Sequence, residues 1–257
     1  MKDTAPLPQT NIAPHRRTLT ALTPLRLVSA AAASLSLSLA LSSCTNVAGF
    51  SQPSLVRVID ASYLAPGVNI YVEKSLLAAN TGEGYISNYG TVTPSAAAPI
   101  QIAAANGGAP LFSTTGSLLA GQQHSVFLTD NAASPISYTV TILADQQTPA
   151  PSGHSTFRFL NQAPRTGAVD VYMIPADVTI ANSIPLITDL AAGAASPYTT
   201  FASQTVTMVV VPTGLATPKY TSAPIALTGG EVRTVVMVDS QLTSNPPVNV
   251  VIANDVN

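Results

Sequence analysis

Short stretches in which apolar and polar residues alternate recur along the chain after residue 54, and they predict β-strands. Residues 68–72 (VNIYV) and 169–173 (VDVYM) both carry an apolar residue at every second position, in the same phase. Strict alternation places one face of a strand against a core and the other face in water. Clusters of Gly, Pro and Asn separate such stretches, as at residues 65–67 (APG) and 212–214 (PTG). Since no segment in this region keeps a sustained helical period, we predict an all-β fold.

The same part of the chain contains an internal duplication. Residues 56–72 (VRVIDASYLAPGVNIYV) align without gaps to residues 157–173 (FRFLNQAPRTGAVDVYM), at an offset of 101 residues. A later block, residues 118–130 (LLAGQQHSVFLTD), aligns to residues 227–239 (LTGGEVRTVVMVD). Between these blocks Tyr89 corresponds to Tyr198. A period near 100 residues is too long for a solenoid repeat and suits a small domain.

The duplicated unit predicts two tandem antiparallel β-sandwich domains of immunoglobulin-like type, preceded by an N-terminal signal helix. We expect the first β-sandwich repeat at residues 55–146 and the second at residues 155–257. Residues 147–154 contain two prolines, so this linker is expected to be semi-extended and solvated. The chain has one Cys and no Trp, which excludes the Cys–Trp–Cys core of antibody domains.

The opening block of each copy resembles a bacterial cell-surface family named domain of unknown function forty-three ninety-seven, whose repeats begin with V-R-x-x-H-A-S-P-D-A-P-x-V-D-V-Y-V. The first copy keeps Val56, Arg57, Ala61, Ser62, Pro66, Val68, Tyr71 and Val72, and the second keeps Arg158, Pro164, Val169, Asp170, Val171 and Tyr172. Asp60 and Asn161 stand where the family has His. The resemblance covers nearly all of residues 55–257. It implies an exported β-domain, often in tandem and often lipid-anchored, with no assigned activity.

The N-terminus predicts export and lipid attachment. Residues 27–41 (LVSAAAASLSLSLAL) form an uncharged stretch of 15 residues, which fits a secretory signal and falls short of the roughly 20 residues of a membrane-spanning helix. The basic residues that precede it are Arg16, Arg17 and Arg26. Residues 41–44 (LSSC) resemble the bacterial lipobox, which implies that Cys44 is the lipidation site. Two or more acyl chains anchor a protein stably, whereas one holds it only marginally.

We therefore assign residues 1–43 to a lipoprotein signal peptide and residues 44–54 to a tether. Two alternatives remain open: an ordinary signal peptide that ends near a Cys, and a twin-arginine signal at residues 15–19 (HRRTL). Thr45 replaces the Asp that resembles an inner-membrane retention signal. This favours the outer membrane of the bacterial cell envelope, with the side of that membrane undetermined.

Composition and charge exclude a nucleic-acid partner. Charged residues make up 9% of the chain, against about 25% in an average domain, and the net charge is −2. The basic residues are scattered, so there is no patch to bind a phosphate backbone. We expect contact with the membrane through acylated Cys44, and an unknown protein or glycan of the envelope as partner.

The sequence gives no catalytic or metal motif, and we predict a protein that is not an enzyme, with no cofactor and no metal. His154 is expected to be a solvated residue of the linker, and His124 a wet surface residue, because the second copy has Arg233 or Val232 at its place. The carboxylates are spread singly, without calcium-loop or nucleophile motifs. Four of them follow predicted strands and are interpreted as turn residues: Asp130, Asp145, Asp239 and Asp255.

The strongest candidate for a binding or register-fixing face is an Arg–Tyr pair in each copy. Tyr71 shares the polar phase of its strand with Arg57, and Tyr172 does so with Arg158. We predict that each pair lies on one outward face, with the ring beneath the guanidinium.

Three functions remain open from the sequence. The first is a non-catalytic structural or adhesive lipoprotein of the envelope. The second is a glycan-binding or small-ligand-binding lipoprotein. The third is a hydrolase, which requires His124 or a pair of aspartates to meet in a pocket.

Overall fold

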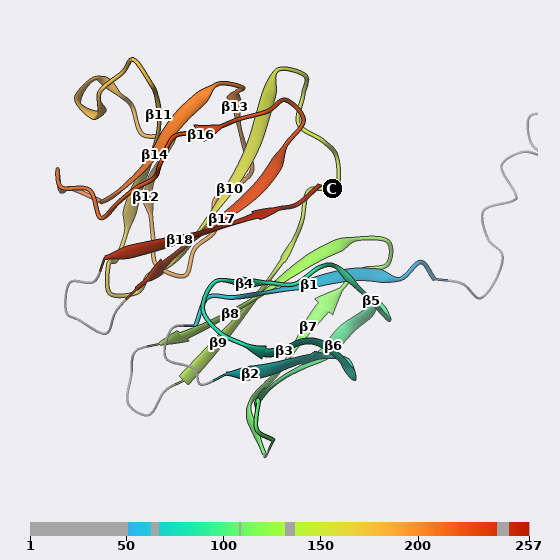
Figure 1. The fold of residues 1–257 in the computed structure, drawn as a ribbon. Coiled ribbons are helices and arrows are strands. Elements are labelled where there is room, and N and C mark those ends of the chain that lie inside the picture. Colours follow the sequence, from blue (N-terminus) through green and yellow to red (C-terminus); the bar gives the residue numbers. More distant parts are fainter. Residues whose placement is uncertain (1–50, 63–66, 108, 132–136, 241–246, 257) are drawn as a thin grey trace, which may run out of the picture. The chain divides into compact units, whose positions relative to one another are not determined.

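The computed structural model describes residues 51–256, apart from residues 63–66, 108, 132–136 and 241–246. The predicted signal helix, Cys44 and residues 44–50 of the tether lie outside the described residues. Residues 51–257 belong to one compact unit. The described part consists of strands and one short 3₁₀ helix, η1 (Ile180–Asn182), which confirms the all-β prediction (Figure 1). Among these residues, no helix has the length and apolar character needed to cross a membrane.

The first half of the unit folds into two sheets. Its strands are β1 (Ser54–Asp60), β2 (Val68–Val72), β3 (Ser75–Thr81), β4 (Tyr85–Ile86), β5 (Gly90–Val92), β6 (Ser95–Ala104), β7 (Pro110–Leu118), β8 (Gln123–Asn131) and β9 (Ser137–Ala144). One sheet has the order β4-β1-β8-β9, with β5 also paired to β1, and the other has the order β3-β2-β6-β7.

The second half has two further sheets. Its strands are β10 (His154–Gln162), β11 (Val169–Pro175), β12 (Ile187–Leu190), β13 (Thr199–Ala202), β14 (Thr205–Pro212), β15 (Tyr220–Thr221), β16 (Ile225–Ala226), β17 (Val232–Asp239) and β18 (Val248–Asn254). One sheet has the order β13-β10-β17-β18 and the other β12-β11-β14-β15, with β16 also paired to β14.

The prediction of purely antiparallel sheets is wrong at the centre of one sheet in each half. Strand β1 pairs in parallel with β8, with Arg57 opposite Ser125. Strand β10 pairs in parallel with β17, with Arg158 opposite Thr234. A parallel pair needs a long crossover connection, and here the other sheet of the same half supplies it.

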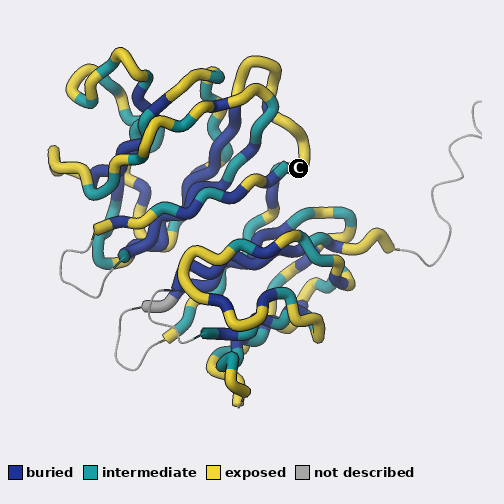
Figure 2. The backbone as a smooth tube through the Cα atoms, in the orientation of Figure 1, coloured by how far each residue is buried: buried dark blue, intermediate teal, exposed yellow. Residues whose placement is uncertain are grey.

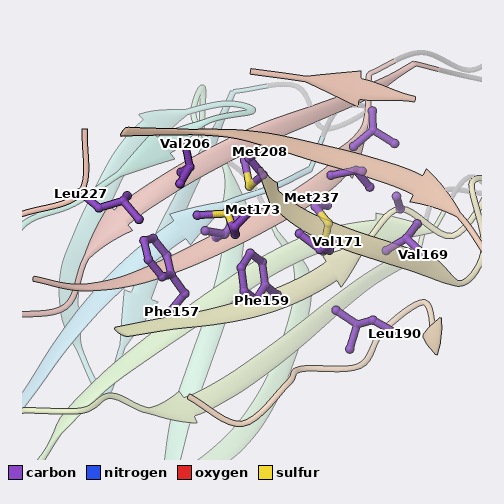
Figure 3. Close-up of a cluster of buried hydrophobic side chains, with 14 residues drawn as sticks. Phe157, Phe159, Val169, Val171, Met173, Leu190, Val206, Met208, Leu227 and Met237 are labelled. Atoms are coloured by element: carbon purple, nitrogen blue, oxygen red, sulfur yellow. The ribbon is translucent and has the colours of Figure 1, made fainter. Parts of the chain in front are cut away.

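Each half encloses a core between its own two sheets. In the first half the core includes Val56, Val58, Ile70, Ile100 and Leu128. In the second half it includes Phe157, Phe159, Met173, Met208 and Met237 (Figure 3). In β2 buried and half-buried residues alternate along the whole strand, as the sequence predicts. The β-sandwich arrangement follows from this packing of sheet on sheet.

The sheets that contain β1 and β10 are buried on both faces. A third cluster joins the first half to the second through residues of both sheets: Ile59, Ala61, Phe127, Leu160, Val236, Val238, Val251 and Ala253. As a result, all eight residues after His154 in β10 are buried, on one face of the sheet or the other, and so are seven of the eight residues of β17 (Figure 2).

The connection between the halves is not wholly solvated, which corrects the prediction made for residues 147–154. Ala150 is buried, and its N–H donates to the carbonyl of Gly230 at 3.1 Å. His154 is exposed, as expected, although it is the first residue of β10.

We expect Phe127→Ala to lower the free energy of unfolding by about 3–5 kcal/mol, because it empties a buried site in the cluster shared by both halves. Denaturant unfolding followed by circular dichroism measures this loss. The matched control is Leu111→Ala, at a side chain that is 42% exposed, where the change should stay within about 0.5 kcal/mol. Amide exchange should rise in β10 and β17 as well as in β8. Faster exchange in the first half alone would contradict a shared cluster.

Candidate functional site

Two arginines point from the central strands of the two halves toward each other. Val56 and Val58 face the core of the first half, so alternation turns Arg57 to the opposite face of β1. The same alternation in β10 turns Arg158 away from Phe157 and Phe159. Both arginines are almost completely buried, at 2% and 4% exposed. A buried guanidinium requires partners, and here these partners come largely from the other half.

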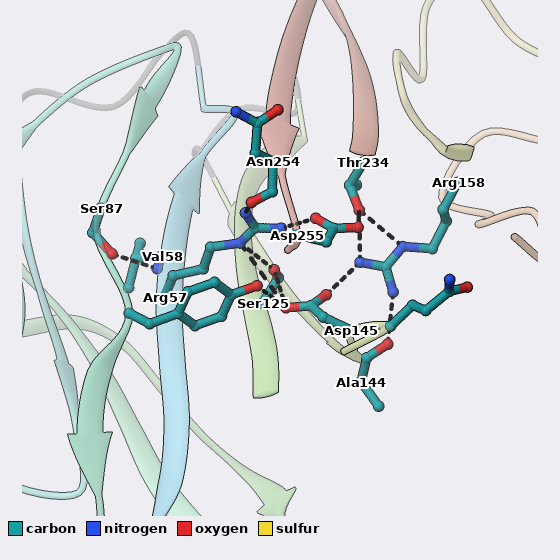
Figure 4. A network of polar contacts seen from close by, with 12 residues as sticks. Arg57, Val58, Ser87, Ser125, Ala144, Asp145, Arg158, Thr234, Asn254 and Asp255 are labelled. Carbon is teal, nitrogen blue, oxygen red and sulfur yellow. Dashed lines mark hydrogen bonds and ion pairs between the residues drawn. The ribbon is translucent and has the colours of Figure 1, made fainter. Parts of the chain in front are cut away.

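Arg57 of the first half reaches the last strand of the second half. Its Nη2 forms an ion pair with Asp255 Oδ1, and its Nη1 donates to the carbonyl of Asn254 at 2.5 Å (Figure 4). Its Nε donates to Ser125 Oγ at 2.7 Å, on the neighbouring strand β8.

Arg158 makes the reciprocal contacts with the last strand of the first half. Its Nη2 is 2.5 Å from Asp145 Oδ1, and its Nη1 donates to the carbonyl of Ala144 at 2.8 Å (Figure 4). Its Nε donates to Thr234 Oγ1 at 3.2 Å, on the neighbouring strand β17. Each half thus gives its arginine to the other half and receives the other half's arginine on its aspartate.

A tyrosine completes each side of this arrangement. The Tyr89 ring lies under the Arg57 guanidinium at 4.9 Å, and the Tyr198 ring lies under that of Arg158 at 4.8 Å. Tyr89 donates its hydroxyl to Asp145 Oδ2 at 2.8 Å, and Tyr198 donates its hydroxyl to Asp255 Oδ2 at 2.7 Å. Burial, together with the adjacent carboxylate, raises the pKa of both phenols, so both stay protonated donors.

We call the eight residues of this arrangement the reciprocal network: Arg57, Tyr89, Ser125, Asp145, Arg158, Tyr198, Thr234 and Asp255. Ser125 and Thr234 donate their hydroxyls to Asp145 and Asp255, at 2.7 Å each. Each carboxylate therefore accepts hydrogen bonds from an arginine, a tyrosine and a hydroxyl side chain. Two positive and two negative charges balance one another. Both aspartate side chains are fully buried, so neither has the access to solvent or substrate that a general base needs.

Comparison with protein families assigns the first part of this structure. Residues 54–172 match the family model described as "Domain of unknown function (DUF4397)". This stretch is a DUF4397 domain. No curated protein matches the chain. The match begins at β1 and ends at Tyr172 in β11, so it contains Arg57, Asp145 and Arg158. Asp255, which pairs with Arg57 of the DUF4397 domain, lies beyond it.

The predicted pairing of Arg57 with Tyr71 is wrong, and so is that of Arg158 with Tyr172. Arg57 lies in the sheet of β1, whereas Tyr71 lies in the sheet of β2, on the other side of the sandwich. Tyr172 packs instead beside Ile174, Val209 and Val211. An Arg–Tyr stack does occur in each half, but its ring belongs to Tyr89 or Tyr198. The alternation of residues along a strand shows which of them lie on the same side of that strand. It does not show to which sheet another strand belongs.

His124 of the DUF4397 domain is buried rather than wet, which corrects the prediction for this residue. It is 3% exposed, and its Nδ1 lies 3.1 Å from Ser54 Oγ. The Leu119 N–H donates to Nε2 at 3.5 Å, and Ser54 Oγ donates to the carbonyl of Gln122 at 3.4 Å. We assign the N–H of the ring to Nδ1, because only this tautomer satisfies all three contacts.

This tautomer bears on hydrolysis. A serine nucleophile must give its proton to the imidazole, and here the imidazole donates to Ser54 instead. Ser54 is also completely buried. Burial lowers the pKa of His124, although nearby Asp145 acts in the opposite direction, so the ring is held neutral. The geometry is that of a structural hydrogen-bond chain.

Two further buried carboxylates also have structural partners. Asp60 accepts hydrogen bonds from the Ser62 N–H at 3.0 Å and from Thr81 Oγ1 at 3.0 Å. Burial raises the pKa of Asp60 despite these bonds. Asp239 accepts from the Arg165 N–H at 2.7 Å and from Thr166 Oγ1 at 2.6 Å. Nothing is described of the Asp130 side chain. In the described part of the chain, no three His, Cys, Asp or Glu side chains come together as metal ligands.

The sequence held one signal for the reciprocal network that the turn interpretation overlooked. Asp145 and Asp255 end the last strand of their halves at corresponding places, and Tyr89 corresponds to Tyr198. An Arg, a Tyr, a hydroxyl residue and an Asp recur in this order in both halves. Because Arg and Asp are costly to bury, this recurrence indicates a polar site that both halves have in common. What the sequence lacked was any indication that the two sets face each other.

We expect Arg57→Met to lower the free energy of unfolding by about 3–5 kcal/mol, because it leaves Asp255 buried without its cation. The matched control is Arg233→Met, which removes a more exposed pair with Glu231 and should cost about 1 kcal/mol or less. Equal losses for the two variants in denaturant unfolding would contradict the role given to the reciprocal network.

We expect His124 to make stability depend on pH. Because burial lowers its pKa below the ordinary 6.5, its contribution is complete above pH 6.5 and is lost as the pH falls through 6.5 toward the lower folded value. The pH dependence of the unfolding free energy should therefore flatten over this window in His124→Gln. The His154→Gln variant, at an exposed site, should keep the wild-type slope. A wild-type slope in His124→Gln would rule out this assignment.

Proposed function

We propose that this chain is a non-catalytic, lipid-anchored protein of the bacterial cell envelope, built from two tandem copies of one β-sandwich domain of immunoglobulin-like type. In this role it acts as a structural or adhesive module that an acylated Cys44 holds at the membrane. The outer membrane is favoured because Thr45 is not an acidic retention residue. The protein or glycan partner is contacted through the folded unit.

The observation that carries this proposal is the reciprocal network. It uses both buried arginines and two buried aspartates to hold one half against the other. Side chains that could have served acid–base chemistry are therefore committed to structure. A rigid pair of domains suits a protein that presents a surface at a fixed distance.

The matching order of strands in the two halves supports the tandem interpretation. In each half, the sheet that carries the buried arginine has the same order of strands. A short edge strand comes first, followed by the strand with the arginine, its parallel neighbour and the last strand of that half. The network residues occupy corresponding registers, with Arg57 opposite Ser125 and Arg158 opposite Thr234.

The position of β1 limits the distance between a lipid on Cys44 and the folded unit. If Cys44 becomes the first residue, ten residues precede Ser54, and they span at most about 35 Å. The folded unit would then stay close to the membrane that holds the lipid.

Glycan or small-ligand binding is the second candidate. An open polar pocket beside Arg57 favours it. A hydrolase is the third, and the Ser54–His124 geometry supports it least.

We expect Cys44→Ser to release the protein from the membrane fraction, because it removes the atom that carries the acyl chains. Mass spectrometry of the native protein should find Cys44 as the first residue, bearing lipid. The matched variant Thr45→Asp should keep the lipid and shift the protein from the outer to the inner membrane on a density gradient. Native protein with an unmodified Cys44 would overturn the anchoring, whatever the folded unit binds.

A further inference from the structure

A polar pocket opens at the Arg57 side of the reciprocal network. Its volume is about 250 Å³, and its lining includes Arg57, Ser87, Asn88, Tyr89, Ile252 and Asn254. Drug-sized ligands usually occupy about 300–1,000 Å³, so this pocket suits a smaller molecule with a single ring. It draws on residues just after β4 and on the end of β18, so it exists only while the two halves are together.

The second half supplies an internal comparison, because the Arg158 side of the network has the same construction. Ser196 corresponds to Ser87, since the hydroxyl of each accepts the N–H of the residue after its arginine. Tyr198 and Tyr89 are the stacked rings. Asn88 lies between Ser87 and Tyr89, and Pro197 lies between Ser196 and Tyr198, so Asn88 corresponds to Pro197.

The last strands give the second difference between the two sides. Asn254 and Ala144 each give their carbonyl oxygen to an arginine, so these two residues correspond. The side chain of Ala144 carries no polar group, whereas that of Asn254 is an amide. On the Arg158 side the segment between the halves also reaches the site, because the Gln146 N–H donates to the Tyr198 hydroxyl at 3.1 Å. The two amide side chains thus occur on the Arg57 side, where they line the pocket.

Both amides are placed to meet a ligand. Asn88 and Asn254 are exposed, and the Asn254 amide points away from the network in Figure 4. A carboxamide offers both donors and an acceptor. No hydrogen bond of the network depends on these two side chains.

The charges of the residues that line the pocket indicate which class of ligand it can bind. Arg57 is paired with Asp255, and an anion would have to compete with this buried carboxylate. The two amides, Tyr89 and Ile252, which also line the pocket, carry no charge. Donors and acceptors side by side with an aromatic ring and an apolar patch match the hydroxyls and C–H faces of a neutral sugar.

We propose that this pocket binds one neutral sugar residue of a glycan, with Asn88 and Asn254 as the hydrogen-bonding side chains. The proposal goes beyond the structural role given above and does not depend on lipid attachment at Cys44.

The test uses the compact unit, residues 51–257, without lipid. Glucose, galactose, N-acetylglucosamine and inorganic phosphate are each titrated at millimolar concentrations by calorimetry, with saturation-transfer NMR as a second readout for the sugars. We expect at least one of the three sugars to bind. In Asn88→Pro/Asn254→Ala its affinity should fall at least about tenfold, as expected for the loss of two hydrogen-bonding groups.

The double variant is designed to fold, because Pro197 and Ala144 occupy the corresponding places on the other side. Its melting temperature should match that of the wild type. The control is Asn249→Ala, at an exposed residue of the same strand β18 that does not line the pocket, and it should bind the sugar as the wild type does.

Three results would overturn the proposal: no binding of any of the three sugars, binding that survives in a folded double variant, or binding of inorganic phosphate in place of the sugars. None of these results bears on the lipid at Cys44, which is tested separately by mass spectrometry of native protein.

Discussion

The structure depends on an exchange of buried charges between its two halves. Each half buries an arginine whose carboxylate partner directly follows the last strand of the other half, at Asp255 for Arg57 and at Asp145 for Arg158. An isolated buried ion is costly, and such a pair stabilises only when its remaining hydrogen bonds are also made. Here tyrosine and hydroxyl donors make them. Arg57 also lies 3.9 Å from Asp145 of its own half, but the hydrogen-bonded ion pair of each arginine is with the aspartate of the other half, which holds the two halves together.

This exchange also determines what kind of surface the molecule presents. The sheets of β1 and β10 bury both faces, one against the core of their own half and one against the other half. Strands buried on both faces have nearly continuous apolar sequences, as in residues 235–238 (VVMV). Arg57 and Arg158, which are among the buried polar residues of these strands, contact the other half. Functional surface is left to the outer sheets and to the rim of the interface, where the two related sides differ in side chains.

Local sequence patterns predicted the elements well and their partners poorly. The alternation in residues 68–72 correctly placed β2 with one buried face. The predicted correspondence of Tyr89 to Tyr198 agrees with the structure, in which each ring stacks on an arginine. The same alternation led to Tyr71 as the ring beneath Arg57, because both residues lie on polar phases. The presence of Arg233 at the corresponding place predicts a surface position for His124, whereas the structure buries it. An arginine can reach solvent through its long side chain from a position where an imidazole stays covered.

By itself, the sequence determined the all-β class and the single buried face of β2, and it raised the expectation of a duplicated unit and of a lipid at Cys44. These are properties of neighbouring residues or of one segment compared with another. Only the tertiary structure decided that β1 runs parallel to β8, that Arg57 faces Asp255, and that a polar pocket lies beside Arg57. These are contacts between residues far apart in the chain, set by how two sheets pack. The phase of a strand fixes which side a residue takes, whereas what lies opposite that side depends on the whole fold.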